Sequence, residues 1–249
     1  MIRRESYDTK MQILNRDVVK YIAMFTMLLN HIALIFLPVG SLLAELFTDI
    51  GYFTAPTMCF FLAEGYEYTQ SKRKYGLRLL LFAILSQIPF ALAFEFGNLN
   101  MIFTLLCCFL ILVIMERIQN PLFRMALCVL MTLTTVISDW ALLAPIYTVL
   151  VRNSRGNRRK LVRSFAVAYV LFVFFNFHNY TMRPEYTAAE ALALDLLSGT
   201  GIIVAAVVIL LFYNGKRAGR GRTFSKWFFY LFYPGHLLLL YLIKLFAMG

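Results

Sequence analysis

The chain consists largely of apolar stretches about as long as a segment that crosses a lipid bilayer. The first of them runs from Val18 to Leu37, and a membrane-spanning helix needs about 20 predominantly apolar residues. Hydrophobic residues make up 61% of the 249 residues and charged residues only 15%, whereas about a quarter of the residues in a soluble domain are charged. A soluble domain is therefore excluded, and we expect the bilayer to be the solvent of this fold.

Charged, proline, glycine and asparagine residues divide the apolar sequence into nine segments. We predict an all-α polytopic membrane protein, a bundle of about nine transmembrane helices that forms a single integral membrane domain over residues 1–249. Residues 1–17 are expected to be a cytoplasmic segment, and residues 214–226 a cytoplasmic linker before the last helix. The sixth segment is short enough to be tilted or re-entrant. The segments lie at residues 18–37, 51–69, 75–94, 100–116, 121–138, 140–151, 161–178, 197–213 and 227–247.

Positive residues are concentrated in alternate loops of this topology. With the N-terminus in the cytoplasm, only Arg183 and Lys244 of the 24 Lys and Arg residues fall outside cytoplasmic segments. Membrane proteins retain Lys and Arg in cytoplasmic loops, so we predict a cytoplasmic N-terminus and an outside C-terminus. Topology alone accounts for the net charge of +11, and we predict no nucleic-acid partner. The positive charge of the most basic loop, residues 152–163, has three explanations besides topology: contact with anionic lipid, with nucleic acid or with a phosphate-bearing ligand.

Two polar residues of the first segment share one helix face. Lys20 and His31 are eleven residues apart, which is about three helical turns and about 16 Å along the axis. Histidine can accept a proton at neutral pH, so this face is a candidate ligand track with His31 as general base. The alternative is a structural histidine that bonds to another helix.

Further polar residues interrupt the apolar segments and are candidates for lining a polar path or for assisting His31. Asp139 lies in a predicted outer hairpin, where it could orient a histidine or simply form a turn. His236 follows Pro234–Gly235, and this pair is expected to break the last helix near mid-bilayer. Glu64 is expected to pair with Lys20 or Arg78, and Ser86 to bond between helices. The polar lining is completed by Asn30, Gln87, Asn100 and Thr104.

Several enzyme classes find no support in the sequence. The four cysteines all lie in apolar runs, without the spacing of a zinc site. Motifs of the HExxH, GxSxG and GxxxxGK[ST] types are missing from the sequence. We therefore predict no metal.

The sequence resembles the TraX family of integral membrane proteins over nearly its whole length. The resemblance is carried by TMLLNHIALIFLP, by the stretch from IGYFTAPTMCFFLAEGYEYT to LSQIPFALAF, and by LNMIFTLL, SDWALLAPIYTVL and FYLFYPGHLLLLYLI. TraX is associated with acetylating the N-terminus of conjugative pilin, and the family looks related to a wider group of membrane-bound acyltransferases. In that group a basic residue and a histidine separated by ten residues mark the first helix, and Lys20 and His31 match this spacing. Asn30 stands where many family members have aspartate before the histidine.

The resemblance implies acyl transfer in a bacterial cytoplasmic membrane, in contact with membrane lipids. Cytosolic acetyl-CoA would be the donor, and the acceptor would be a pilin N-terminus, another exported peptide or an envelope saccharide. His31 would be the base, with Asp139 and His236 as further catalytic candidates. Gln87, Asn100, Thr104 or a backbone amide would stabilise the oxyanion. Cations available for the donor's phosphates are Lys20, Arg78, Arg152, Arg155, Arg158 and Arg159.

Two functions from other classes remain open at this point. A small-molecule transporter or flippase would also bury polar residues and break helices, as Pro145 and Pro234–Gly235 suggest, but the sequence shows no internal repeat. A non-catalytic assembly factor for pili or secretion would leave His31 without a chemical role.

Overall fold

The computed structural model describes residues 11–95, 97–182 and 186–248, and every regular element in these ranges is a helix. The all-helical prediction is confirmed for this part of the chain. Most of the predicted segment 1–17, and Arg183, lie outside the described residues. The elements are α1 (Arg16–Phe36), α2 (Leu42–Gly51), α3 (Thr54–Tyr68), α4 (Lys72–Phe94), α5 (Met101–Arg117), α6 (Pro121–Leu133), η1 (Thr134–Ile137), α7 (Leu143–Asn153), α8 (Arg158–Thr181), α9 (Ala188–Ser198), α10 (Thr200–Val207), η2 (Val208–Phe212) and α11 (Arg222–Met248).

Six helical stretches of the described chain are long and apolar enough to cross a membrane, so this is a multi-pass membrane protein. They are Arg16–Phe36, Leu42–Tyr68, Lys72–Phe94, Arg158–Phe177, Ala188–Phe212 and Arg222–Ala247. The count of nine spans is not confirmed. The three other predicted segments do coincide with helices, but α5 has 17 residues, the α6–η1 stretch is a shorter apolar helix, and α7 has only 11 residues.

Two helices, α2 and α9, lie largely outside the predicted segments, and polar residues cap both of them. The predicted loop between the first two segments contains α2, whose N-cap Ser41 accepts a hydrogen bond from the backbone N–H of Ala44. Helix α9 begins at Ala188 rather than near residue 197, with a capping box between Thr187 and Glu190. Side chains that satisfy the free N–H groups of a first turn determine where a helix starts.

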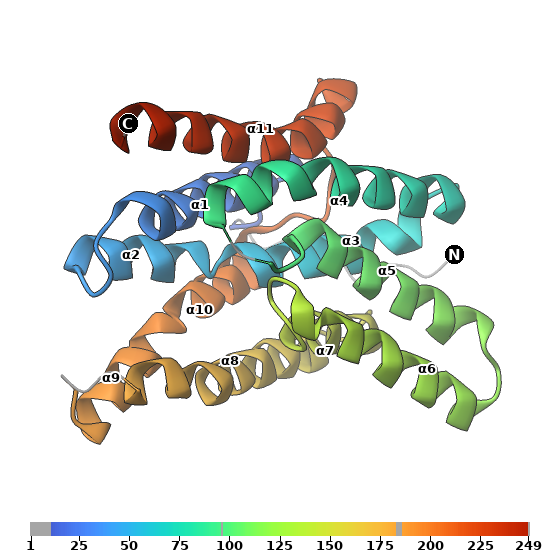
Figure 1. Cartoon of the computed structure of the whole chain (residues 1–249). Coiled ribbons are helices and arrows are strands. Elements are labelled where there is room, and N and C mark those ends of the chain that lie inside the picture. Colours follow the sequence, from blue (N-terminus) through green and yellow to red (C-terminus); the bar gives the residue numbers. More distant parts are fainter. Residues whose placement is uncertain (1–10, 96, 183–185, 249) are drawn as a thin grey trace.

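The expected break at Pro234–Gly235 is wrong, because α11 continues through both residues. A proline removes one N–H donor from a helix, but neighbouring helices in a bundle make this tolerable. Here α11 packs along α4 and α1 (Figure 1). The linker before α11 is also shorter than predicted and ends at Gly221.

Backbone pairing holds the linker before α11 against the start of α1. The Leu14 N–H donates to the Phe212 carbonyl, the Asn214 N–H to the Leu14 carbonyl and the Arg16 N–H to the Lys216 carbonyl, each at 2.9 Å. Segments about 200 residues apart in sequence are therefore side by side. As a result, the basic residues of the linker join those of α1 at one end of the bundle.

The long helices lie side by side in Figure 1, with α11 against α1 and α4, and with α6 and α8 farther from it. Buried side chains of α1, α3, α4, α5 and α11 belong to one continuous apolar core. These same five helices surround the main cavity of the described chain.

Candidate functional site

A cavity of about 660 Å³ lies between α1, α3, α4, α5 and α11. One end is basic and the other apolar. The basic end is lined by Arg16, Lys20, Lys74, Arg78, Arg217, Arg222 and Lys226, and the apolar end by Met24, Met27, Met58, Leu62, Leu79, Met101, Ile102 and Leu105. This arrangement fits an elongated ligand with anionic groups at one end and a less polar arm.

Cationic side chains far outnumber acidic ones at the basic end of the cavity. Seven cationic side chains line it, and Asp17 is the acidic residue among the lining. Helices α1, α4 and α11 begin at this end of the cavity, and a helix N-terminus carries a partial positive charge. Phosphate groups suit such a surface because cations and helix N-termini both bind them.

The Lys20 ammonium lies between two aromatic rings of the cavity wall. Its Nζ is 5.0 Å from the ring centroid of Phe229 and 5.8 Å from that of Phe61. Arg16, one helical turn earlier, also lies over Phe61, with its guanidinium carbon 5.7 Å from the centroid. Ring faces attract cations, so the two rings hold both side chains toward the cavity.

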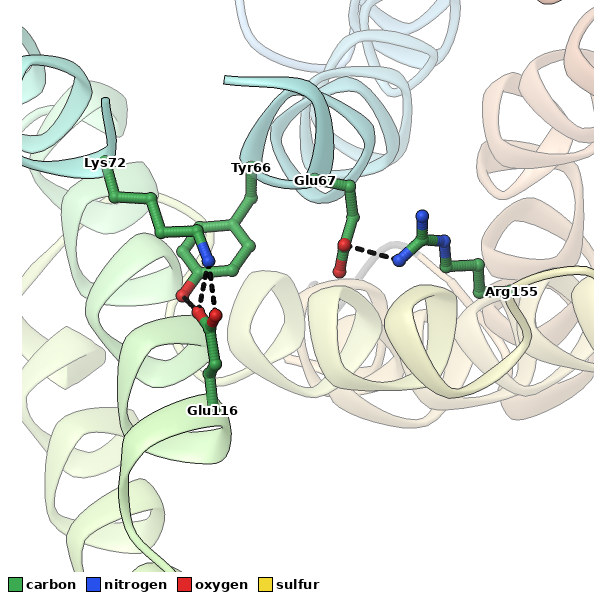
Figure 2. Close-up of polar contacts among 5 residues, drawn as sticks. All are labelled: Tyr66, Glu67, Lys72, Glu116 and Arg155. Carbon is green, nitrogen blue, oxygen red and sulfur yellow. Dashed lines mark hydrogen bonds and ion pairs between the residues drawn. The ribbon is translucent and has the colours of Figure 1, made fainter. Parts of the chain in front are cut away.

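The structure brings only part of the predicted set of cations to the cavity. Lys20 and Arg78 line it, whereas Arg152, Arg155, Arg158 and Arg159 do not. Arg155 instead forms an ion pair with Glu67 of α3, shown in Figure 2. The same figure shows a second polar cluster, in which Lys72 and Tyr66 both contact the carboxylate of Glu116.

Five lining cations were missed by the sequence reasoning. Arg16 and Lys20 are four residues apart, which places them on one helix face and could have drawn attention to the pair. The other four are indistinguishable in sequence from ordinary cytoplasmic loop charges. They are Lys74, Arg217, Arg222 and Lys226.

Tyr233 of α11 lies between the cavity and the two histidines. It is one of the residues that line the cavity, and its side chain is only 4% exposed. Its ring centroid is 6.2 Å from that of His31 and 5.7 Å from that of His236. The backbone N–H of Met101, at the start of α5, donates to its hydroxyl at 3.3 Å.

His31 and His236 form a buried pair beyond Tyr233. His31 Nδ1 and His236 Nε2 are 2.7 Å apart, and the rings are nearly parallel, with an interplanar angle of 8°. The His236 Nδ1 atom lies 2.7 Å from the Phe232 carbonyl oxygen, one turn earlier in α11. Exposure is 5% for His31 and 6% for His236. The predicted histidine of the first helix therefore has the histidine of the last helix as its partner.

These hydrogen bonds determine the tautomers of two neutral rings. A carbonyl oxygen only accepts, so His236 carries its proton on Nδ1 and presents Nε2 as an acceptor. His31 must then donate from Nδ1. The lone pair of a neutral His31 is consequently on Nε2, and this is the arrangement that a general base requires.

Asn30, Glu64 and Ser86, predicted to line a polar path, lie elsewhere than in the cavity wall. The Asn30 amide donates to the Thr48 carbonyl at 3.3 Å and thereby joins α1 to α2. Glu64 accepts a hydrogen bond from the Tyr213 hydroxyl at 2.7 Å, and its carboxylate also lies near enough to Lys20 to attract that charge. Ser86 is fully buried in α4, and its hydroxyl has no hydrogen-bond partner among the described residues, so the expected bond between helices is not found.

Gln87, Asn100 and Thr104, the predicted oxyanion donors, hold the start of α5 in place. The Asn100 amide donates to the Gln87 side-chain oxygen and to the Ala83 carbonyl, both at 2.8 Å. Thr104 donates to the backbone carbonyl of Asp139 at 2.6 Å. These polar groups satisfy one another, and none of the three residues lines the cavity.

Asp139 lies in the loop between η1 and α7. Burial raises the pKa of its carboxyl to about 6, partly offset by a hydrogen bond from the Trp140 backbone N–H. The contacts of the described residues include none between Asp139 and His31, whose hydrogen-bond partner is His236. Asp139 is therefore placed as a partly buried loop carboxyl rather than as the group that orients His31.

Comparison with known proteins gives a match over most of the chain. The family described as TraX protein matches residues 15–244. The chain is also similar to the probable fimbrial assembly protein FimC, serogroup H1, of Dichelobacter nodosus, with 29% identity over 240 residues that cover 91% of this chain and 94% of that protein. No solved structure matches the chain.

Proposed function

Because the chain belongs to the TraX family, we propose that it is a membrane-embedded acyltransferase that moves an acetyl group from cytosolic acetyl-CoA to an amine or hydroxyl acceptor on the opposite side. The observation that carries the proposal is the cavity, which leads from seven cations to Tyr233, whose ring adjoins the buried histidine pair behind the cavity wall. A CoA thioester combines several phosphate charges with a long, less polar arm that ends in the reactive carbonyl, and the cavity has the corresponding two ends.

In this proposal, the position of each residue along the cavity determines its role. The cations at the basic end bind the phosphates and orient the donor. The apolar residues between them and Tyr233 exclude water from the arm. His31 Nε2 takes the proton that the acceptor loses as it attacks the thioester carbon, and His236 keeps the proton of His31 on Nδ1.

The name of the similar Dichelobacter protein connects the proposal to pili. That protein is named as a fimbrial assembly protein, and we extend this association to the present chain. A pilin N-terminus is then the first acceptor to test, with another exported peptide or an envelope saccharide as alternatives.

The first test measures binding of acetyl-CoA to the purified full-length protein in detergent by calorimetry. We expect saturable binding that Lys20→Ala weakens about tenfold, because a charge-assisted contact to a phosphate is lost. Arg163→Ala is the matched control, since Arg163 is an exposed cation that does not line the cavity. Absence of binding by well-folded wild-type protein would overturn the proposal.

The second test separates catalysis from the role of a non-catalytic assembly factor, which the relative's name also fits. Release of free CoA thiol from acetyl-CoA is followed with wild-type protein and with His31→Ala. Loss of a general base costs about 100- to 10,000-fold in rate, while binding and melting temperature should change little. If wild-type protein binds acetyl-CoA but releases no thiol with any acceptor preparation, the assembly-factor function is favoured.

A further inference from the structure

The Tyr233 hydroxyl oxygen accepts a hydrogen bond, but no described residue accepts one from its O–H group. The Met101 N–H donates to the Tyr233 oxygen, so the tyrosine cannot give its own proton back to that group. Among the described residues, Met101 is the hydrogen-bond partner of this hydroxyl. A buried O–H group without an acceptor is costly, and the open space beside this one is the inner end of the cavity.

Two histidine rings and a backbone N–H hold the Tyr233 side chain in place. Its ring is held on one side by His31 and His236, and its oxygen is held at the first turn of α5 by Met101. The N-terminus of α5 also favours negative charge near the hydroxyl. A carbonyl oxygen of a ligand that reaches the inner end of the cavity is the acceptor that this group lacks.

We propose that Tyr233 is a catalytic residue that donates a hydrogen bond to the thioester oxygen of the acetyl donor and stabilises the negative charge that develops there. This inference rests on the proposed function. In the reaction the acceptor atom bonds to the acetyl carbon, the carbon–sulfur bond breaks, the acceptor's proton goes to His31 Nε2, and the thiolate leaves and takes up a proton. Tyr233 keeps its own proton throughout. Gln87, Asn100 and Thr104 do not line the cavity, whereas Tyr233 does.

A spectroscopic test reads this hydrogen bond without requiring turnover. Acetyl-CoA labelled with ¹³C at the thioester carbonyl is bound to the full-length protein, and its carbonyl stretch is measured by isotope-edited infrared difference spectroscopy. A hydrogen bond weakens the C=O bond, so we expect a lower frequency in the wild-type protein than in Tyr233→Phe. The control is Tyr241→Phe, which loses a hydroxyl from the same helix at a site outside the cavity wall.

A kinetic test uses the same pair of variants. Removing one oxyanion donor costs about 100- to 1,000-fold in kcat, so we expect Tyr233→Phe to lose thiol release to that extent with its acetyl-CoA affinity within about twofold of wild type. Tyr241→Phe, outside the cavity wall, should retain kcat.

The outcomes distinguish the two proposals. An unchanged carbonyl frequency in Tyr233→Phe, or an unchanged kcat, overturns the role of Tyr233 and leaves the acyltransferase proposal standing. Failure of the wild-type protein to bind labelled acetyl-CoA overturns the proposed function, and the role of Tyr233 with it. A melting temperature measured for each variant shows whether the phenylalanine proteins are folded.

Discussion

His236 holds its ring between the Phe232 carbonyl and His31, and this position predicts how its replacements should differ. His236→Leu removes the acceptor for His31 Nδ1–H, so the His31 ring can change tautomer or rotate, and we expect kcat to fall about a hundredfold. His236→Gln keeps a side-chain oxygen that can accept, so it should recover part of the loss. The measurement is the pH profile of kcat, because loss of packing alone would not change its shape. Equal activity of the two variants would contradict a positioning role.

Asp139 makes stability depend on pH in a predictable direction. Burial raises the pKa of its carboxyl to about 6 from an ordinary value of 3.8. An acid with a raised pKa in the folded state stabilises the fold below its unfolded pKa, and this contribution is lost as the pH rises through the folded pKa. The shift corresponds to about 3 kcal/mol.

Asp139→Asn should therefore match wild type in melting temperature near pH 4 and exceed it at pH 8. The comparison is made in detergent across this range, with thermal unfolding followed at each pH. Parallel curves for the two proteins would mean that the Asp139 carboxyl does not titrate between the two states.

Single residues differ in how far the sequence reveals their role. Lys20 and His31 are on one helix, so their common face follows from helical geometry alone. The pairing of His31 with His236 spans 205 residues and depends on which helices pack together. Tyr233 is one of 14 tyrosines, and only its position at the end of the cavity distinguishes it from the others.

Helix α3 contributes a glycine that gives the cavity its width. A Cβ at Gly65 would lie 3.1 Å from Arg16 Nη2 and 3.2 Å from the Tyr75 hydroxyl. We expect Gly65→Leu to push a side chain into the basic end and to weaken acetyl-CoA binding tenfold or more. Gly235→Leu is the matched control, because a Cβ there meets no atom within 4 Å. Calorimetry on both variants checks this, and equal affinities would show that the ligand does not pass Gly65.

At the level of elements, each predicted apolar segment coincides with helix in the described structure, but the pattern missed α2 and nearly all of α9 and placed several boundaries wrongly. Polarity marks where the lipid-exposed part of a helix ends, whereas capping side chains such as Ser41 and Thr187 mark where its hydrogen bonding begins. The break predicted at Pro234–Gly235 is wrong for a related reason. Local propensity favours a break there, and packing against α1 and α4 overrides it.

For the whole molecule, the predicted topology is supported by the position of the cationic side chains, which meet at one end of the cavity. Residues from the start of α1, the start of α4 and the linker before α11 line one end of one cavity, and the sequence assigns all of these segments to the cytoplasm. The sequence alone could not show this convergence, because it depends on tertiary packing.

Single-cysteine labelling with a membrane-impermeant maleimide tests this orientation in spheroplasts. Lys216→Cys, in the linker, should react only after the membrane is permeabilised. Val39→Cys, in the connection between α1 and α2 and 87% exposed, should react in intact spheroplasts. The opposite pattern would invert the topology and place the basic end of the cavity outside.

The pairing of the first and last helices also has a consequence for biosynthesis. His31 and His236 are 205 residues apart, and at a synthesis rate of about 5 to 20 residues per second the ribosome needs about 10 to 40 s to travel from one codon to the other. During this interval α1 is in the membrane without the helix that supplies the partner ring, Tyr233 and part of the cavity wall. Under the proposed function, the nascent chain therefore has no assembled site with which to consume acetyl-CoA, and the site is complete only when the final helix has been inserted.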